Sequence, residues 1–167
     1  MESRAKLFGH SIHQQLIPFP LGLLFTAVVF DVIHLITGDT QWGLVSFWMI
    51  AAGVVGGLMA APFGFIDWTA IPAGTRAKRV GAVHGLGNVV VVGLFGASWL
   101  LRNAGVETNP GTLPLVLSFA GAALLVITGW LGGELVDRLG VGVEDGAHLN
   151  APSSLSGRPA SSPSRGD

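Results

Sequence analysis

The chain contains no cysteine and no tyrosine, and only 11% of its 167 residues are charged. The lack of cysteine excludes disulfides, thiolate metal sites and a cysteine nucleophile, and the lack of tyrosine excludes phenol chemistry. Soluble domains carry about 25% charged residues, so this deficit points to a protein embedded in lipid. The formal net charge of −1 gives no indication of a nucleic-acid partner.

Apolar residues concentrate in four long stretches, at about 16–37, 42–65, 80–101 and 113–136. Each stretch can cross a hydrocarbon layer ~30 Å thick at ~1.5 Å per helical residue. Backbone groups in lipid must bond within their own segment, so each stretch is predicted to be a helix. We therefore predict an all-α membrane protein, a four-transmembrane-helix bundle in a membrane domain of residues 1–143. The Ser-, Pro- and Gly-rich residues 144–167 are predicted to be a disordered tail.

The distribution of positive charge predicts the orientation of the bundle. Four spans place both termini on one side, which carries eight basic residues, whereas the other side carries Arg102 alone. The eight are Arg4, Lys6, Arg76, Lys78, Arg79, Arg138, Arg158 and Arg165. This excess predicts that both termini are cytoplasmic in a multi-pass protein of the bacterial inner (plasma) membrane.

Ionisable residues within spans are costly and point to function by default. Asp31 and His34 lie three residues apart in the first span and share a helix face. A hydrogen bond from His34 to the Asp31 carboxylate would lower the cost of burying both. The pair has two interpretations: a polar helix end that reaches the headgroups, or a proton or ligand site.

A second polar group gathers at the predicted cytoplasmic boundary. His13 precedes the first span, Asp67 follows the second, His84 and Asn88 share a face of the third, and Glu134 ends the fourth. His13, Asp67, His84 and Glu134 could hold a divalent metal such as zinc, iron or manganese. Alternatively, His13 and His84 could ligate a haem b iron, with Asn88 beside them. Interfacial ion pairs and proton handling remain the other interpretations.

The two halves of the chain resemble each other. Aligning His13 with His84 also aligns Gly22 with Gly93, and each half reads histidine, span, turn, span and acid. Internal repeats are common in membrane folds, and their sites often lie at the repeat interface. A duplicated hairpin would therefore bring the two histidines together if their rings turn inward.

Small residues recur at four-residue spacing in three spans, which allows close approach of helix backbones. These pairs are Gly53 with Gly57, Gly81 with Gly85, and Gly129 with Gly133. They predict tight packing within the bundle or homodimerisation through one face. The sequence contains no hydrolase, kinase or dinucleotide motif, which favours a protein that is not an enzyme.

Several segments in order resemble a family of small four-span bacterial membrane proteins, the domain of unknown function numbered 2231. The resemblance covers about residues 7–143. It is carried by Gly9-His10-Ser11-Ile12-His13, Pro18-Phe19-Pro20-Leu21-Gly22, Gly64-Phe65-Ile66-Asp67, Ile71-Pro72 with Gly74-Thr75-Arg76-Ala77-Lys78-Arg79, His84 with Asn88, and Gly129-Trp130-Leu131-Gly132-Gly133-Glu134 running into Gly140-Val141-Gly142-Val143.

The resemblance implies an integral membrane protein without an established activity. Fusion of some relatives to Rieske-type iron–sulphur domains implies a redox-anchor role, although this sequence has no such Cys/His motif and would need a redox partner protein. Ser11 and Gln14 stand where relatives often have prolines, and His34 where an aromatic residue is usual. The last departure weakens Asp31 and His34 as a family site.

Two functions from different classes follow. The first is a membrane anchor subunit that binds haem or a metal through His13 and His84. The second is a cofactor-free scaffold that joins membrane partners through its glycine faces. A transporter is disfavoured by the small size and by the few charges near the middle of the spans.

The orientation can be tested because the chain has no native cysteine. In intact cells, Thr108→Cys should react with an impermeant thiol reagent and Ser3→Cys should not, because they lie on opposite sides of the membrane. Lysed and denatured cells provide the control in which both positions react. Labelling of Ser3→Cys alone in intact cells would reverse the orientation.

Overall fold

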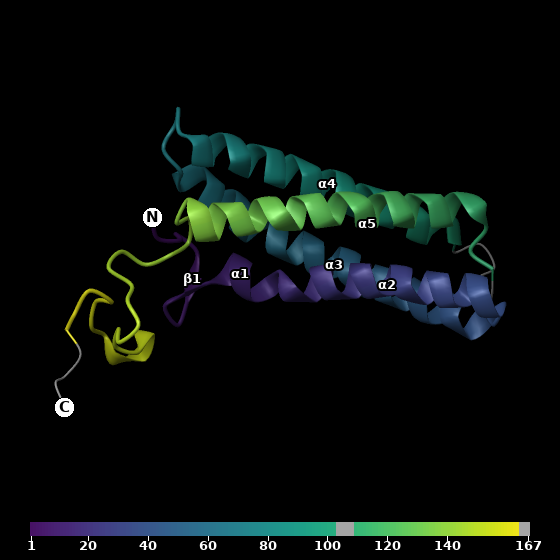
Figure 1. The fold of residues 1–167 in the computed structure, drawn as a ribbon, viewed down its shortest axis with the longest axis horizontal. Coiled ribbons are helices and arrows are strands. Elements are labelled where there is room, and N and C mark those ends of the chain that lie inside the picture. Colours follow the sequence, from purple (N-terminus) through teal and green to yellow (C-terminus); the bar gives the residue numbers. More distant parts are fainter. Residues whose placement is uncertain (103–108, 164–167) are drawn as a thin grey trace.

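The computed structural model describes residues 1–102 and 109–163, which form mostly helices (Figure 1). A two-stranded antiparallel hairpin opens the chain, with β1 at Lys6–Leu7 and β2 at His10–Ser11. The helices are α1 Ile12–Leu16, α2 Pro18–Thr37, α3 Thr40–Ala70, α4 Arg76–Arg102 and α5 Thr112–Gly133, which continues into the π-helix η1 Glu134–Arg138. In residues 144–163, turns surround one short 3₁₀ helix, η2 Ser154–Ser156.

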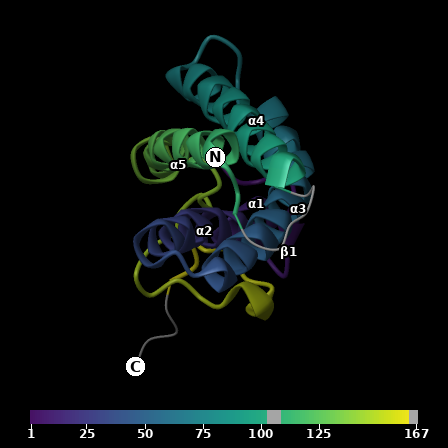
Figure 2. The ribbon, with the colours of Figure 1, turned by 90° about the vertical axis from the view of Figure 1, so that its right-hand side faces the viewer.

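The long helices form a four-helix bundle of two antiparallel hairpins, α2 with α3 and α4 with α5 (Figure 2). Four helical segments of the described chain are long and apolar enough to cross a membrane, which confirms the predicted fold class. α3 and α4 run further than the apolar stretches predicted, and leave only residues 71–75 between them. Their extra turns carry Asp67, Trp68, Arg76 and Lys78, which belong to the polar rim of the bundle.

The two ends of the bundle differ in what they carry. One end, here called the tail end, carries the N-terminal hairpin, α1, the α3–α4 connection, η1 and residues 144–163 (Figure 1). The other, the turn end, carries Gly38, Asp39 and the last turn of α4. Gly38 ends α2 in the left-handed conformation at φ 69°, and the Asp39 carboxylate accepts the Gln41 N–H at 2.9 Å to cap α3.

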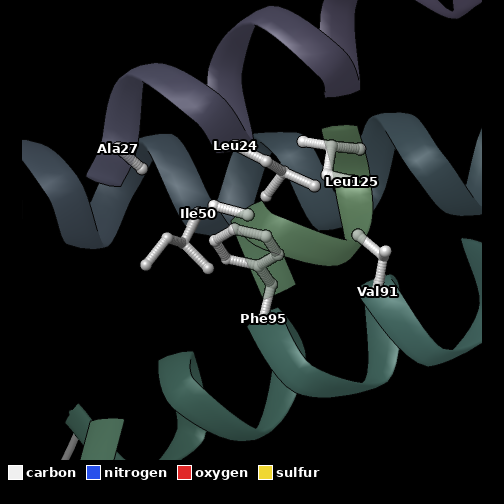
Figure 3. Close-up of a cluster of buried hydrophobic side chains, with 7 residues drawn as sticks. Leu24, Ala27, Ile50, Val91, Phe95 and Leu125 are labelled. Atoms are coloured by element: carbon white, nitrogen blue, oxygen red, sulfur yellow. The ribbon is translucent and has the colours of Figure 1, made fainter. Parts of the chain in front are cut away.

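The centre of the bundle is an apolar core to which all four helices contribute (Figure 3). Leu24 of α2 and Phe95 of α4 are its largest fully buried side chains. Each fits a glycine of the other helix in its hairpin: a Cβ on Gly53 would lie 2.6 Å from Leu24, and one on Gly121 would lie 2.8 Å from Phe95. The core also contains Ala27, Ile50, Val91, Ala122 and Leu125.

The outward faces of the helices are apolar as well. Large side chains there are more than half exposed in the isolated chain, as lipid contact requires. Examples from α3, α4 and α5 are Val55, Leu86, Val89, Ile127 and Trp130. Burial within the chain is therefore confined to a narrow seam, and polar contacts at the two ends must help to fix the bundle.

A buried ion pair joins the two hairpins at the turn end. The Arg102 guanidinium donates to both oxygens of Asp31, at 2.7 and 2.6 Å. Its remaining N–H groups donate to Ser98 at 3.2 Å, to Ser46 at 3.1 Å and to Ser118 at 2.8 Å. All five donors of the guanidinium are thus used, and Asp31 is completely buried.

The structure gives Asp31 a partner other than the one predicted. His34 donates from Nδ1 to the Asp39 carbonyl oxygen at 2.9 Å, because that carbonyl lies just beyond the end of α2. Arg102 forms a bidentate bond with Asp31, which a single imidazole N–H cannot do. The expected His34–Asp31 bond is therefore replaced by a contact across 71 residues of sequence.

Removal of one member of this pair should weaken the bundle strongly. Asp31→Ala leaves the Arg102 charge buried without a counterion, so we expect a loss of about 3–5 kcal/mol in the free energy of unfolding, measured by denaturation in lipid nanodiscs. Arg79→Ala, which removes an exposed arginine at the opposite end of α4, is the control and should change it by less than about 0.5 kcal/mol. Equal effects of the two substitutions would contradict the assigned role of the pair.

Candidate functional site

His13 of α1 and His84 of α4 meet at the tail end of the bundle. Their ring centres are 6.5 Å apart and the ring planes are nearly perpendicular, at 88°. Both side chains are partly buried. The structure thus brings together the two histidines that the repeat pattern aligned.

Each ring is fixed by a backbone carbonyl of the second helix in its own hairpin. Nδ1 of His13 lies 3.0 Å from the Ala60 carbonyl oxygen in α3, and Nδ1 of His84 lies 2.9 Å from that of Thr128 in α5. A carbonyl oxygen only accepts, so the hydrogen is assigned to Nδ1 in both rings. In the neutral form of a ring held in this way, the electron pair lies on Nε2, the nitrogen with which such a histidine would bind a metal.

Glycines make room for both rings. A Cβ on Gly64 would lie 2.6 Å from Cε1 of His13, and one on Gly132 would lie 3.1 Å from Cε1 of His84. In both hairpins the glycine lies four positions after the residue whose carbonyl accepts from the histidine, so carbonyl and glycine share one helix face. Two different helices thus hold an imidazole in the same way.

Asn88 lies beside the second ring, one turn after His84. Its amide donates to the His84 backbone carbonyl at 2.9 Å, and the same nitrogen lies 3.2 Å from Nε2 of His84. This contact restricts the rotation of the ring and places a polar group next to the free nitrogen. Asn88 is therefore a neighbour of the histidine pair, as the sequence indicated.

Asp67 and Glu134, the carboxylates of the expected four-residue metal set, have other partners. The Asp67 carboxylate accepts from the Ser3 hydroxyl at 2.7 Å and the Arg4 N–H at 2.8 Å. Glu134 accepts from Arg76 at 2.6 Å. In residues 1–102 and 109–163 no three His, Cys, Asp or Glu side chains are grouped to hold a metal, so the described site consists of two histidines.

The N-terminal residues are bound tightly to the tail end. Ser3 and Ser11 are buried, and Lys6 pairs with Glu2 at 2.6 Å and with Glu144 at 3.1 Å. The hydrogen bond between Lys6 and Glu2 raises the pKa of Lys6 and lowers the pKa of Glu2. Residues 1–11 therefore form an ordered cover over the end of α3.

The three glycine pairs do not behave alike. Gly53, Gly57 and Gly81 face Leu24, Val92 and Trp68, so they pack inside the bundle. By contrast, a Cβ on Gly85 or Gly133 would meet no described atom within 4 Å. Gly53, Gly57 and Gly81 therefore support tight packing within the bundle, whereas Gly85 and Gly133 lie on the outer surface with space around them.

The sequence identified most of the polar residues but not the groups to which they are hydrogen-bonded. Arg102 had one usable signal: it follows Asp31 by 71 residues, the same spacing that separates His84 from His13. The serines around Arg102 and the Ala60 and Thr128 carbonyls gave none, because serine and backbone carbonyls occur in every helix.

Comparison with known proteins gives one match. A family model described as "Predicted membrane protein (DUF2231)" matches residues 9–145. The comparisons with curated proteins and with solved structures yield no match.

The contact between His13 and Gly64 can be tested by adding a methyl group to the glycine. Gly64→Ala places a Cβ against the imidazole, so we expect a loss of about 1–3 kcal/mol in the free energy of unfolding. Gly133→Ala is the matched control: its Cβ meets nothing, and alanine favours the helix, so stability should stay equal or rise by up to about 1 kcal/mol. Thermal unfolding of both variants in nanodiscs makes the comparison, and an equally stable Gly64→Ala protein would contradict the contact.

Proposed function

The chain belongs to the DUF2231 family of predicted membrane proteins, and we propose from its histidine pair that it is a membrane anchor subunit with one haem b iron bound by His13 and His84. The observation that supports this proposal is the pair of neighbouring rings, each with Nδ1 held by a carbonyl so that Nε2 is the nitrogen that can bind a metal. We place the protein in the bacterial inner membrane with both termini in the cytoplasm, where a redox partner protein would exchange electrons with it.

The donor set fits a haem iron better than a bare divalent ion. Two imidazoles complete the coordination of a haem iron, since the porphyrin supplies its other four ligands. A metal bonded to one nitrogen of each ring at ~2.0 Å sets the ring centres about 6 Å apart, close to the 6.5 Å found. A bare zinc or manganese ion needs further ligands, and Asp67 and Glu134 are engaged elsewhere.

In this function the residues of the chain bind and orient, and the bound haem supplies one-electron chemistry. Ala60 and Thr128 fix the two rings through their carbonyls. Asn88 sits next to Nε2 of His84, where an amide influences the basicity of the ligand.

A cofactor-free scaffold is the alternative function. Gly85 and Gly133 support it, because their open positions would allow a helix of a partner or of a second copy to approach closely. In that case the histidine pair would only join the two hairpins. The two functions differ in whether the purified protein is coloured.

Absorption spectroscopy separates them. The protein, purified in mild detergent from haem- and iron-replete cells, should show a Soret band that shifts on reduction, and His13→Ala and His84→Ala should each reduce bound haem at least about tenfold, because each removes an axial ligand. His148→Ala, an exposed histidine of the tail, is the control and should retain full haem. A colourless, metal-free preparation would overturn the anchor function and support the scaffold.

A further inference from the structure

The two hairpins hold their histidines through matching contacts, which reveals an internal two-fold relation. His13 uses Ala60 and Gly64 of α3, and His84 uses Thr128 and Gly132 of α5. Deeper in the bundle Leu24 fits Gly53 as Phe95 fits Gly121. At the turn end, Asp31 of the first hairpin and Arg102 of the second hairpin occupy equivalent positions and form an ion pair with each other.

The relation is weaker where the histidines join their helices. His84 lies inside α4, which runs without interruption from Arg76 to Arg102. His13 lies in the five-residue helix α1, whose backbone continues into α2, because Ile17 has helical dihedral angles and its N–H donates to the His13 carbonyl at 3.1 Å. Pro18 and Pro20 have no N–H to donate to the carbonyls one turn before them, so two hydrogen bonds of an uninterrupted helix are missing at this join. A contact from outside the helix therefore adds to the support of His13.

Asp67 provides that support from the same face of α3 that receives His13. It follows Ala60 by seven residues and Gly64 by three, so all three lie on one side of the helix. Its carboxylate is buried and accepts from four groups of the N-terminal segment. These are the Ser3 hydroxyl, the Arg4 and Ala5 N–H groups, and the Ser11 hydroxyl at 3.4 Å.

Ser11 links this cluster directly to His13. It is the residue immediately before α1, where a serine side chain usually caps the helix, but its hydroxyl makes no such bond and lies within reach of Asp67 instead. His13 follows two residues later. The spacing of 68 residues that relates Ala60 to Thr128 makes the apolar Leu135 the equivalent of Asp67, so the acids that the repeat pattern matched, Asp67 and Glu134, are not equivalent. His84 has no carboxylate in the place that Asp67 occupies near His13.

We propose that Asp67 is the positioning residue that keeps His13 against His84. It does so by binding residues 3–11 to the end of α3, so that the short helix α1 presents its histidine to the pair. His84 is thus positioned by its own long helix, and His13 by its helix together with the docked segment. The inference deepens the proposed function, since His13 is one of the two ligands, but its test does not depend on a bound haem.

The test measures the reactivity of His13 towards diethylpyrocarbonate, read by mass spectrometry of the full-length protein in nanodiscs. Asp67→Asn removes the charge that draws the four donors, so His13 should become modified on the order of tenfold faster as the segment opens. His148, which is exposed and lies outside this segment, is the internal control whose rate should not change. Glu134→Gln breaks an ion pair at the same end and should leave His13 protected.

A milder substitution guards against loss of the fold. Ser3→Ala removes the closest donor to Asp67 without altering a helix, and it should raise the rate of His13 modification by a smaller factor than Asp67→Asn. Unchanged His13 reactivity in both variants would overturn the positioning role, as would an equal rise in Glu134→Gln. A protein that is colourless but shows the predicted change would reject haem binding and retain the role of Asp67.

Discussion

The bundle depends on a charge that has no access to water. Arg102 ends α4, yet its guanidinium lies among side chains of all four long helices and uses each of its N–H groups. In lipid, apolar surface gains little from meeting other apolar surface, so directional contacts determine which helix faces meet. Asp31 and Arg102 occupy equivalent positions of the two hairpins. Their ion pair therefore favours packing of the first hairpin against the second over packing of two copies of the same hairpin. The register that brings His13 near His84 at the other end follows from it.

The centre of the bundle limits what the two polar ends can do together. His13 and Asp31 lie roughly 27 Å apart along the helices, at ~1.5 Å per residue. Between them the described core consists of aliphatic and aromatic side chains, among them Leu24 and Phe95. This apolar core therefore separates the polar contacts of one end of the bundle from those of the other.

The sequence predicted the spans well and the polar contacts poorly, for physical reasons. Lipid demands about twenty apolar residues per span, a requirement visible in composition alone, so the helices are confirmed to within a few residues. The partner of Asp31 depended on which helix faces meet across the bundle, and a local search for partners found only His34. Asp67 was interpreted as a metal ligand because it shares a membrane boundary with His13 and His84, and residues 3–11, which bind it, carry no periodic pattern that would predict the contact. The approach of His13 to His84 was expected only if their rings turned inward, and helix spacing could not determine that.

The two histidines are held by similar contacts in different surroundings. Each ring binds a carbonyl and fits against a glycine of the neighbouring helix. Near His13, two prolines follow α1 and a buried carboxylate binds the preceding residues, whereas His84 lies within the uninterrupted helix α4. A histidine inside a long helix moves with that helix, whereas the contacts of a docked segment can open at the cost of a few hydrogen bonds. The turn end, with its fully bonded guanidinium, holds the hairpins together, so opening of the N-terminal segment would change the surroundings of His13 more than those of His84.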